Sequence, residues 1–172
     1  MKRERKIKKI RLVLLILGIL STSIPVFAAQ QAQSLTVNMG VLARAKLMLG
    51  VSAINFPDAD PNTIPSIAAT ENAASVTAKV RTGVSSTATL THRASGNLSA
   101  GPGITIPIGN VTWTATGAGY VAGTMSSSAD VRAASWTGSG SYSGNFSYFI
   151  VNSWSYVTGN YTVSTTYTLT AP

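Results

Sequence analysis

The sequence Tyr161-Thr-Val-Ser-Thr-Thr-Tyr-Thr-Leu-Thr-Ala171 alternates between an apolar or aromatic phase, in which Thr165 is the one hydroxyl residue, and a phase of hydroxyl residues only. Successive side chains of a β-strand point to opposite faces, so this pattern predicts a long antiparallel strand with one dry and one hydroxyl-coated face. A slip of one residue would bury five hydroxyl groups, each costing roughly 1–3 kcal/mol if unpaired. The register of this strand is therefore strongly specified.

The same alternation recurs upstream, between turns rich in Ser, Gly and Pro. It predicts strands over 76–81, 87–91, 104–108, 111–116, 131–136 and 142–151. Residues 76–81 and 87–91 are expected to form a hairpin around Thr82-Gly83. Turn signals every roughly 8–12 residues, without a convincing amphipathic helix after residue 56, indicate an all-β fold. We expect an immunoglobulin-like antiparallel β-sandwich of about 7–10 strands.

Residues 35–51 fit either of two structures. Leu35, Val37 and Met39 begin an apolar phase of period two that continues to Val51. Residues 41–48 are also rich in Leu, Ala, Arg and Lys, which are good helix formers. The strand is favoured because the flanking sequence alternates, and a bend is expected near Gly50.

The N-terminus has the organisation of a secretory signal peptide. Seven basic residues up to Arg11 precede an apolar run, and Val26-Phe27-Ala28 forms a small-residue cleavage site. A retained membrane anchor is the alternative, but Ser21, Thr22, Ser23 and Pro25 interrupt the apolar run. The expected organisation is a signal peptide over 1–28 and a secreted β-sandwich domain over 29–172, with no membrane span after cleavage.

Cleavage would remove most of the positive charge. The chain has thirteen Lys and Arg and five acids; residues 1–28 hold seven of these cations and Glu4, which leaves six cations and four acids. The remaining net charge of about +2 removes the main support for a nucleic-acid partner. The chain also contains no cysteine, so sheet pairing and core packing must hold the exported domain together.

Candidates for catalysis and metal binding are few. His92 is the single histidine; without a Gly-x-Ser-x-Gly turn it is interpreted as an ordinary residue at a strand end, so no catalytic residue and no cofactor are assigned. Asp58 and Asp60 lie in a Pro-bounded loop, where they could contribute to a calcium site, although turn-forming roles are favoured. The four acids suit neither a glycosidase nor another small hydrolase, because a glycosidase holds two carboxylates across a cleft. We therefore expect a protein that is not an enzyme.

The large aromatic residues allow two interpretations. They could form a platform on which sugar rings stack, or they could fill the core between two sheets, which is the more common use of such side chains. The candidates are Trp113, Trp136, Trp154, Tyr120, Tyr142, Tyr148 and Tyr156. For a glycan-binding surface, Trp136 beside its Gly- and Ser-rich loop is the first candidate, together with Tyr120.

The C-terminal dodecapeptide Tyr161 to Pro172 resembles the distal motif of WxL-type bacterial surface domains. Leu169 matches the Leu of that motif and Tyr167 stands in the place of its Trp, while Trp113-Thr114-Ala115 is a partial counterpart of the proximal element. The resemblance implies a secreted β-rich module that attaches non-covalently to peptidoglycan. The layout is also similar to pilin-like β-sandwiches of the spore coat U type, which implies assembly by strand exchange.

Two functions follow as expectations. The first is a non-catalytic, structural or adhesive component of a bacterial cell envelope that binds wall peptidoglycan or surface polysaccharide. The second is a self-assembling subunit, in which residues 29–40 add a strand to the open sheet edge of a neighbouring copy.

The export prediction has a direct measurement. The secreted protein is expected to begin at Ala29, because small residues at Val26-Phe27-Ala28 suit signal peptidase. Intact-mass spectrometry of the secreted fraction measures this. A mass that still includes residues 1–28 would instead support the retained anchor.

Overall fold

The structure, a computed structural model, describes residues 31–172. The predicted signal peptide over 1–28 lies outside the described residues. Residues 31–39 belong to a separate N-terminal unit and form neither helix nor strand. The compact unit Gly40–Pro172 contains every strand of the described chain.

The regular secondary structure of Gly40–Pro172 consists of strands and one short 3₁₀ turn, as expected for the predicted all-β fold. The strands are β1 (Arg44–Leu49), β2 (Ser66–Ala68), β3 (Ala74–Arg81), β4 (Thr87–Ala94), β5 (Leu98–Gly101), β6 (Ile104–Ile106), β7 (Val111–Thr116), β8 (Gly123–Thr124), β9 (Val131–Thr137), β10 (Gly140–Val151) and β11 (Thr165–Thr170). A short 3₁₀ turn, η1 (Ile108–Asn110), follows Pro107. Pro107 ends β6 because proline has no N–H to donate to a ladder.

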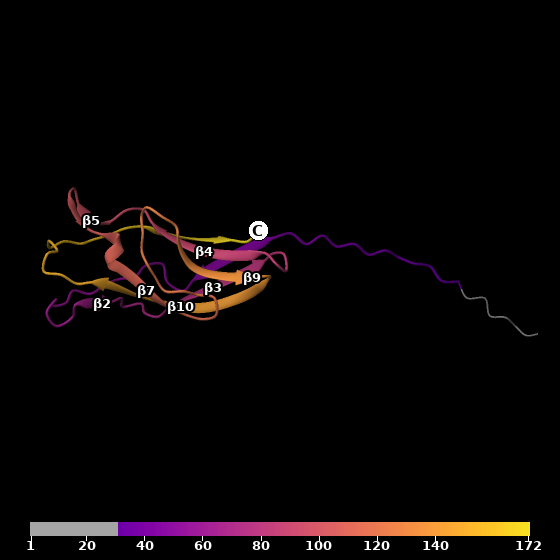
Figure 1. The fold of residues 1–172 in the computed structure, drawn as a ribbon, viewed down its shortest axis with the longest axis horizontal. Coiled ribbons are helices and arrows are strands. Elements are labelled where there is room, and N and C mark those ends of the chain that lie inside the picture. Colours follow the sequence, from indigo (N-terminus) through magenta and orange to yellow (C-terminus); the bar gives the residue numbers. More distant parts are fainter. Residues whose placement is uncertain (1–30) are drawn as a thin grey trace, which may run out of the picture. The chain divides into compact units, whose positions relative to one another are not determined.

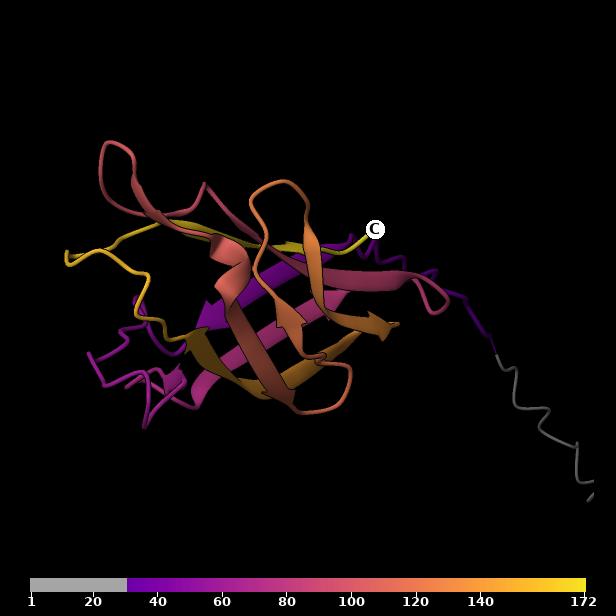
Figure 2. The same ribbon diagram turned by 60° about the vertical axis from the view of Figure 1, so that its left-hand side comes forward.

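The strands form an antiparallel sandwich. One sheet has the order β1-β3-β10-β7-β8, with β2 paired to the end of β10; the other has the order β11-β4-β9. Strand β4 lies in one layer and β10 in the other (Figure 1). Figure 2 shows β1, β3 and β10 running side by side across the larger sheet. A separate hairpin, β5-β6, completes the pairing.

The sequence predicts strand β1 correctly but predicts the wrong pairing for β3 and β4. The strand interpretation of residues 41–48 is confirmed over Arg44–Leu49, and the strand ends at Gly50. The predicted hairpin between 76–81 and 87–91 is wrong, because β3 pairs with β1 and β10 whereas β4 pairs with β9 and β11. The turn after Arg81 therefore carries the chain from one sheet to the other.

The strand predicted over residues 161–171 forms over the shorter range of β11, Thr165–Thr170, and it keeps the predicted alternation. Tyr167, Leu169 and Ala171 are half-buried, whereas Thr166, Thr168 and Thr170 are exposed. The ladder to β4 sets Leu169 opposite Leu90 and Tyr167 opposite His92. This register directs the apolar phase of β11 to the interior, as the sequence predicts.

His92 lies inside the core and not at a strand end, so that interpretation of the sequence was wrong. It is fully buried within β4, in the same phase as Ala88 and Leu90. Its ring lies 4.6 Å from that of Tyr167 and 5.4 Å from that of Trp113, measured between ring centroids. Among the described residues neither ring nitrogen has a hydrogen-bond partner.

Burial lowers the pKa of His92 to about 4, because the charged imidazolium loses its hydration. The neighbouring titratable groups are Tyr167 and Tyr148, whose hydroxyls are 2.8 Å apart. Burial raises the pKa of both tyrosines, so they carry no charge at neutral pH. His92 is therefore held neutral by its surroundings.

Acid is expected to destabilise the fold through His92. The unfolded chain takes up this proton below about pH 6.5, but the folded chain only below about pH 4, so the stabilisation is complete above 6.5 and is lost as the pH falls to 4. Integration over this interval gives about 3 kcal/mol of unfolding free energy. Urea unfolding between pH 7 and pH 4 measures it.

The matched variant is His92→Phe, which keeps an aromatic ring and removes the titrating group. The wild-type protein should lose stability over this pH interval by about 3 kcal/mol more than the variant. Equal pH dependence of the two proteins would contradict the assignment to His92.

Candidate functional site

The two long sides of the sandwich are closed differently. On one side, backbone hydrogen bonds join the chain before β8 to β9: the Val121 N–H donates to the Ala133 carbonyl at 2.9 Å and the Ser135 N–H to the Gly119 carbonyl at 2.9 Å. Tyr120 forms an isolated bridge with Ala134 between these bonds. This side therefore has no free sheet edge between 119–121 and 133–135.

On the other side, the edge strands β1 and β11 approach each other without pairing (Figure 2). Among the strands of residues 31–172, β1 pairs with β3 alone and β11 with β4 alone. A hydrogen bond from the Thr82 hydroxyl to the Pro172 carbonyl ties the two sheets at the C-terminal end of β11. We call the space between β1 and β11 the seam.

Interior-facing side chains along the seam are incompletely covered. Leu49 pairs with Val76 in the β1-β3 ladder, so both face the core, yet Leu49 is 45% exposed and Val76 only 2%. Leu169 pairs with Leu90 in the same way and is half-buried, whereas Leu90 is fully buried. The central strands bury their inner faces, and the two seam strands do not.

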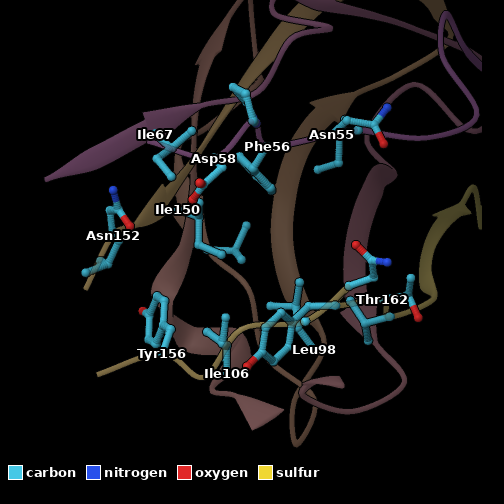
Figure 3. A pocket seen from close by; sticks show the side chains of 18 of the residues that line it. Asn55, Phe56, Asp58, Ile67, Leu98, Ile106, Ile150, Asn152, Tyr156 and Thr162 are labelled. Carbon is cyan, nitrogen blue, oxygen red and sulfur yellow. The ribbon is translucent and has the colours of Figure 1, made fainter. Parts of the chain in front are cut away.

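At one end the seam widens into a cavity of about 1340 Å³. Its walls are the segment that follows β1, over residues 52–61, and the segment that leads from β10 towards β11, over residues 150–165. Ile67, Ile150 and Ile106 come from three different strands and point towards the cavity (Figure 3). The cavity therefore has an apolar floor and two loop walls.

Polar side chains hold the loop wall over residues 52–61 in place. Both carboxylate oxygens of Glu71 accept hydrogen bonds from Asn55, from its backbone N–H at 2.7 Å and its side-chain amide at 2.6 Å. These bonds, the side-chain one first, lower the pKa of Glu71 to about 2. The side-chain amide of Asn152 donates to the carbonyls of Ala59 and Ile64. The loop is thus tied to the turn between β2 and β3 and to the residue that follows β10.

The candidate calcium residues lie in this wall. Asp60 accepts the backbone N–H of Asn62 at 2.8 Å, the turn-forming role that the sequence favoured. Asp58 is exposed at the rim of the cavity. Within residues 31–172 no group of three or more His, Cys, Asp or Glu side chains is placed to hold a metal ion.

The candidate glycan-binding residues are in the core, which corrects the proposal of Trp136 and Tyr120 as a surface platform. They are only 6% and 7% exposed. The Trp136 ring stacks on Tyr142 at 4.8 Å, and its indole N–H donates to the Ala118 carbonyl at 2.8 Å. Gly119 makes this approach possible, because a side chain there would collide with the indole and its φ is positive. Neither ring is available to a sugar.

Trp154 is the exposed tryptophan among the three, with 70% of its surface accessible. It lies in the loop after β10, and its indole N–H donates to the side chain of Asn62 at 3.1 Å. Composition alone does not favour Trp154 over Trp136, since both are near Ser-rich turns. Residue 154 has the same parity as Phe146, Tyr148 and Ile150, which face the core from β10, so the alternation does not indicate that Trp154 is exposed.

Comparisons with known proteins assign no family. No model of a known protein family matches the chain, and no curated protein is significantly similar to it. The resemblances to WxL-type domains and to spore coat U type proteins stay predictions. In the part of the chain that the structure describes, no helix is long and apolar enough to cross a membrane.

Proposed function

We propose that this protein is a non-catalytic, structural component of a bacterial cell envelope that assembles by adding a strand from one copy to the seam of another. The observation that carries the proposal is the incomplete burial of Leu49 and Leu169 opposite fully covered partners. An unpaired edge strand with an apolar inner face is a template for strand addition.

The segment proposed to fill the seam is the leader segment, residues 29–40. Its apolar residues Leu35, Val37 and Met39 are 83–88% exposed and alternate with Thr36 and Asn38. Such a segment can place one apolar face against a core and one polar face towards water. The six residues of the leader segment from Leu35 span about 20 Å when extended, similar to the length of the six-residue β11.

The leader segment is better suited to the seam of a second copy of the protein than to the seam of its own copy. The guanidinium Nε of Arg81 donates to the Leu42 carbonyl at 2.9 Å, which holds residue 42 beside the end of β3. To lie beside β1 in its own seam, the leader segment would have to reverse direction between residue 40 and Arg44, where β1 begins. Insertion into another copy requires no such reversal.

Point substitutions in the leader segment test the proposal. Val37→Asp places a carboxylate on the apolar face and should weaken association about tenfold or more, since burial of a valine contributes roughly 1.5–3 kcal/mol. Asn38→Asp makes a similar change in charge on the polar face and should leave association nearly unchanged. Size-exclusion chromatography with light scattering measures both.

A mixing experiment separates donor from acceptor. A chain that begins at Gly40 keeps the whole compact unit and should provide a seam but no donor. A Leu49→Arg variant should provide a donor but no usable seam, because the cation would enter the apolar interior. Each protein alone should be monomeric, and the mixture should form heterodimers. Multimers of the chain beginning at Gly40 would reject the proposal.

A second candidate function is binding of peptidoglycan or surface polysaccharide, and the exposure of Trp154 is the observation that favours it. An exposed indole offers a flat apolar face, and Asn62 and Asp60 beside it offer polar atoms to hydroxyl groups. This surface replaces Trp136 and Tyr120 as the site to examine.

Trp154→Ala is expected to reduce the amount of protein that sediments with purified peptidoglycan, since the stacking surface is lost. Val84→Ala, at another exposed apolar residue, in the β3-β4 turn, is the control and should not change binding. Unchanged sedimentation of Trp154→Ala would argue against a glycan site at this loop.

A further inference from the structure

Four cations lie together on the outer face of β1 and β3. The ladder sets Arg44 directly opposite Arg81 and Lys46 directly opposite Lys79. The intervening pair, Ala45 and Val80, is in the phase that faces the core. Because alternate residues point to opposite faces, all four charged side chains leave the outer face of the sheet, and all four are exposed. We call Arg44, Lys46, Lys79 and Arg81 the basic patch.

The four cationic side chains of the basic patch lie close together and repel one another. Opposite residues of an antiparallel pair are about 5 Å apart, and alternate residues along a strand about 7 Å apart. Like charges directly opposite each other destabilise a strand pair, and β1 and β3 carry two such pairs. The patch holds four of the six Lys and Arg residues over 29–172.

Carboxylates do not neutralise the basic patch. Over the described residues, the salt bridge that the structure contains joins Arg93 to Asp130 at 3.7 Å, in the other sheet and its preceding turn. Glu71 is bound by Asn55, and Asp58 and Asp60 lie in the loop wall of the cavity. The charge of the patch is therefore available to an external anion.

The surroundings of the basic patch are polar and flat. Ser141 of β10 pairs with Lys79, and the next outward pair is Thr77 and Ser143, whose hydroxyls are 3.3 Å apart. The aromatic side chains of this part of β10, such as Tyr142, alternate with these serines and face the interior. The face therefore offers charges and hydroxyls but no ring on which a nucleic-acid base could stack.

We propose that the basic patch binds a linear polymer of phosphate diesters without bases, of the polyol phosphate type, in the cell envelope. The Nε of Arg81 donates to the Leu42 carbonyl, so the groups offered to phosphate oxygens are the Nη groups of Arg81, the guanidinium of Arg44 and the two Lys ammonium groups. Successive rows along the strands can contact successive phosphates. The face of the sheet is separate from the strand edge at the seam, so polymer binding does not depend on strand addition.

The test uses the full secreted chain and fluorescently labelled poly(glycerol phosphate), followed by anisotropy over a range of NaCl concentrations. The wild-type protein should bind at low salt and lose affinity steeply as salt increases, because binding releases counterions. Lys46→Gln combined with Lys79→Gln should weaken binding about tenfold or more at low salt. It should also reduce the slope of log K against log salt concentration by roughly two, about one for each contact removed.

Arg132→Gln, which removes an exposed cation from β9 in the other sheet, is the matched control and should bind like the wild type. The urea midpoint of the double variant should equal or exceed that of the wild type, because two repelling charges are removed; this excludes misfolding as the cause of lost binding. Three results would overturn the proposal: absence of wild-type binding at low salt, an equal loss in Arg132→Gln, or tighter binding to an oligothymidylate with the same number of phosphates.

Discussion

The pairing of β10 along both of its edges is the constraint on which the rest of the structure depends. Along one edge its residues 140–146 pair with β3 and residues 149–151 with β2, and along the other edge residues 145–150 pair with β7. The inner phase of this one strand supplies Phe146, Tyr148 and Ile150 to the core. Phe146 contacts aromatic rings from both sheets, including Trp113 of β7 and Tyr167 of β11. In a chain without cysteine, this strand joins the layers that a disulfide joins in many secreted sandwiches.

Burial of the core decreases with distance from β10, and the two sides of the sandwich differ in how far it decreases. Towards β8 and β9 the sheets are joined by backbone hydrogen bonds around Tyr120, whose hydroxyl also donates to carbonyls of the larger sheet. Towards β1 and β11 the inner phases are partly open to solvent. The proposed strand addition uses this second side, and the closed side shows that the fold can cover its core where the sequence provides the connection.

Most strands could be predicted from the sequence, because period-two alternation directly reflects a half-buried strand. The alternation does not predict which strands pair with each other or in which register they pair. Residues 76–81 and 87–91 have the alternation of a hairpin, and the short turn between them also suits a crossing between sheets; only the tertiary pairing distinguishes these two cases. The basic patch illustrates the same limit, since Arg44 and Lys46 share a face in the sequence but Lys79 and Arg81 become their neighbours only through the β1-β3 register.

The sequence failed to locate the candidate site residues for a related reason, because burial depends on tertiary contacts. His92 has the same parity as Ala88 and Leu90, so its inward direction was present in the sequence, but the charged residue that follows it suggested a strand end. Trp136 is followed by a Gly- and Ser-rich turn that suggested exposure, whereas the glycines near Ala118 allow the backbone to approach the indole and bury it. The cavity had no sequence signal, because its walls are segments of irregular structure that are held by a few side-chain hydrogen bonds such as those of Asn152.

Each copy carries its leader segment at the start of the chain and its seam within the folded unit, so a contact between them joins two different surfaces. Such a heterologous contact does not close on itself unless a rotation axis happens to complete a ring. Repetition of this contact would therefore produce a directional filament. The seam would be unfilled in the subunit at one end, and the leader segment would be free in the subunit at the other end. Each end would keep adding copies until a different molecule occupies its unfilled seam or binds its free leader segment.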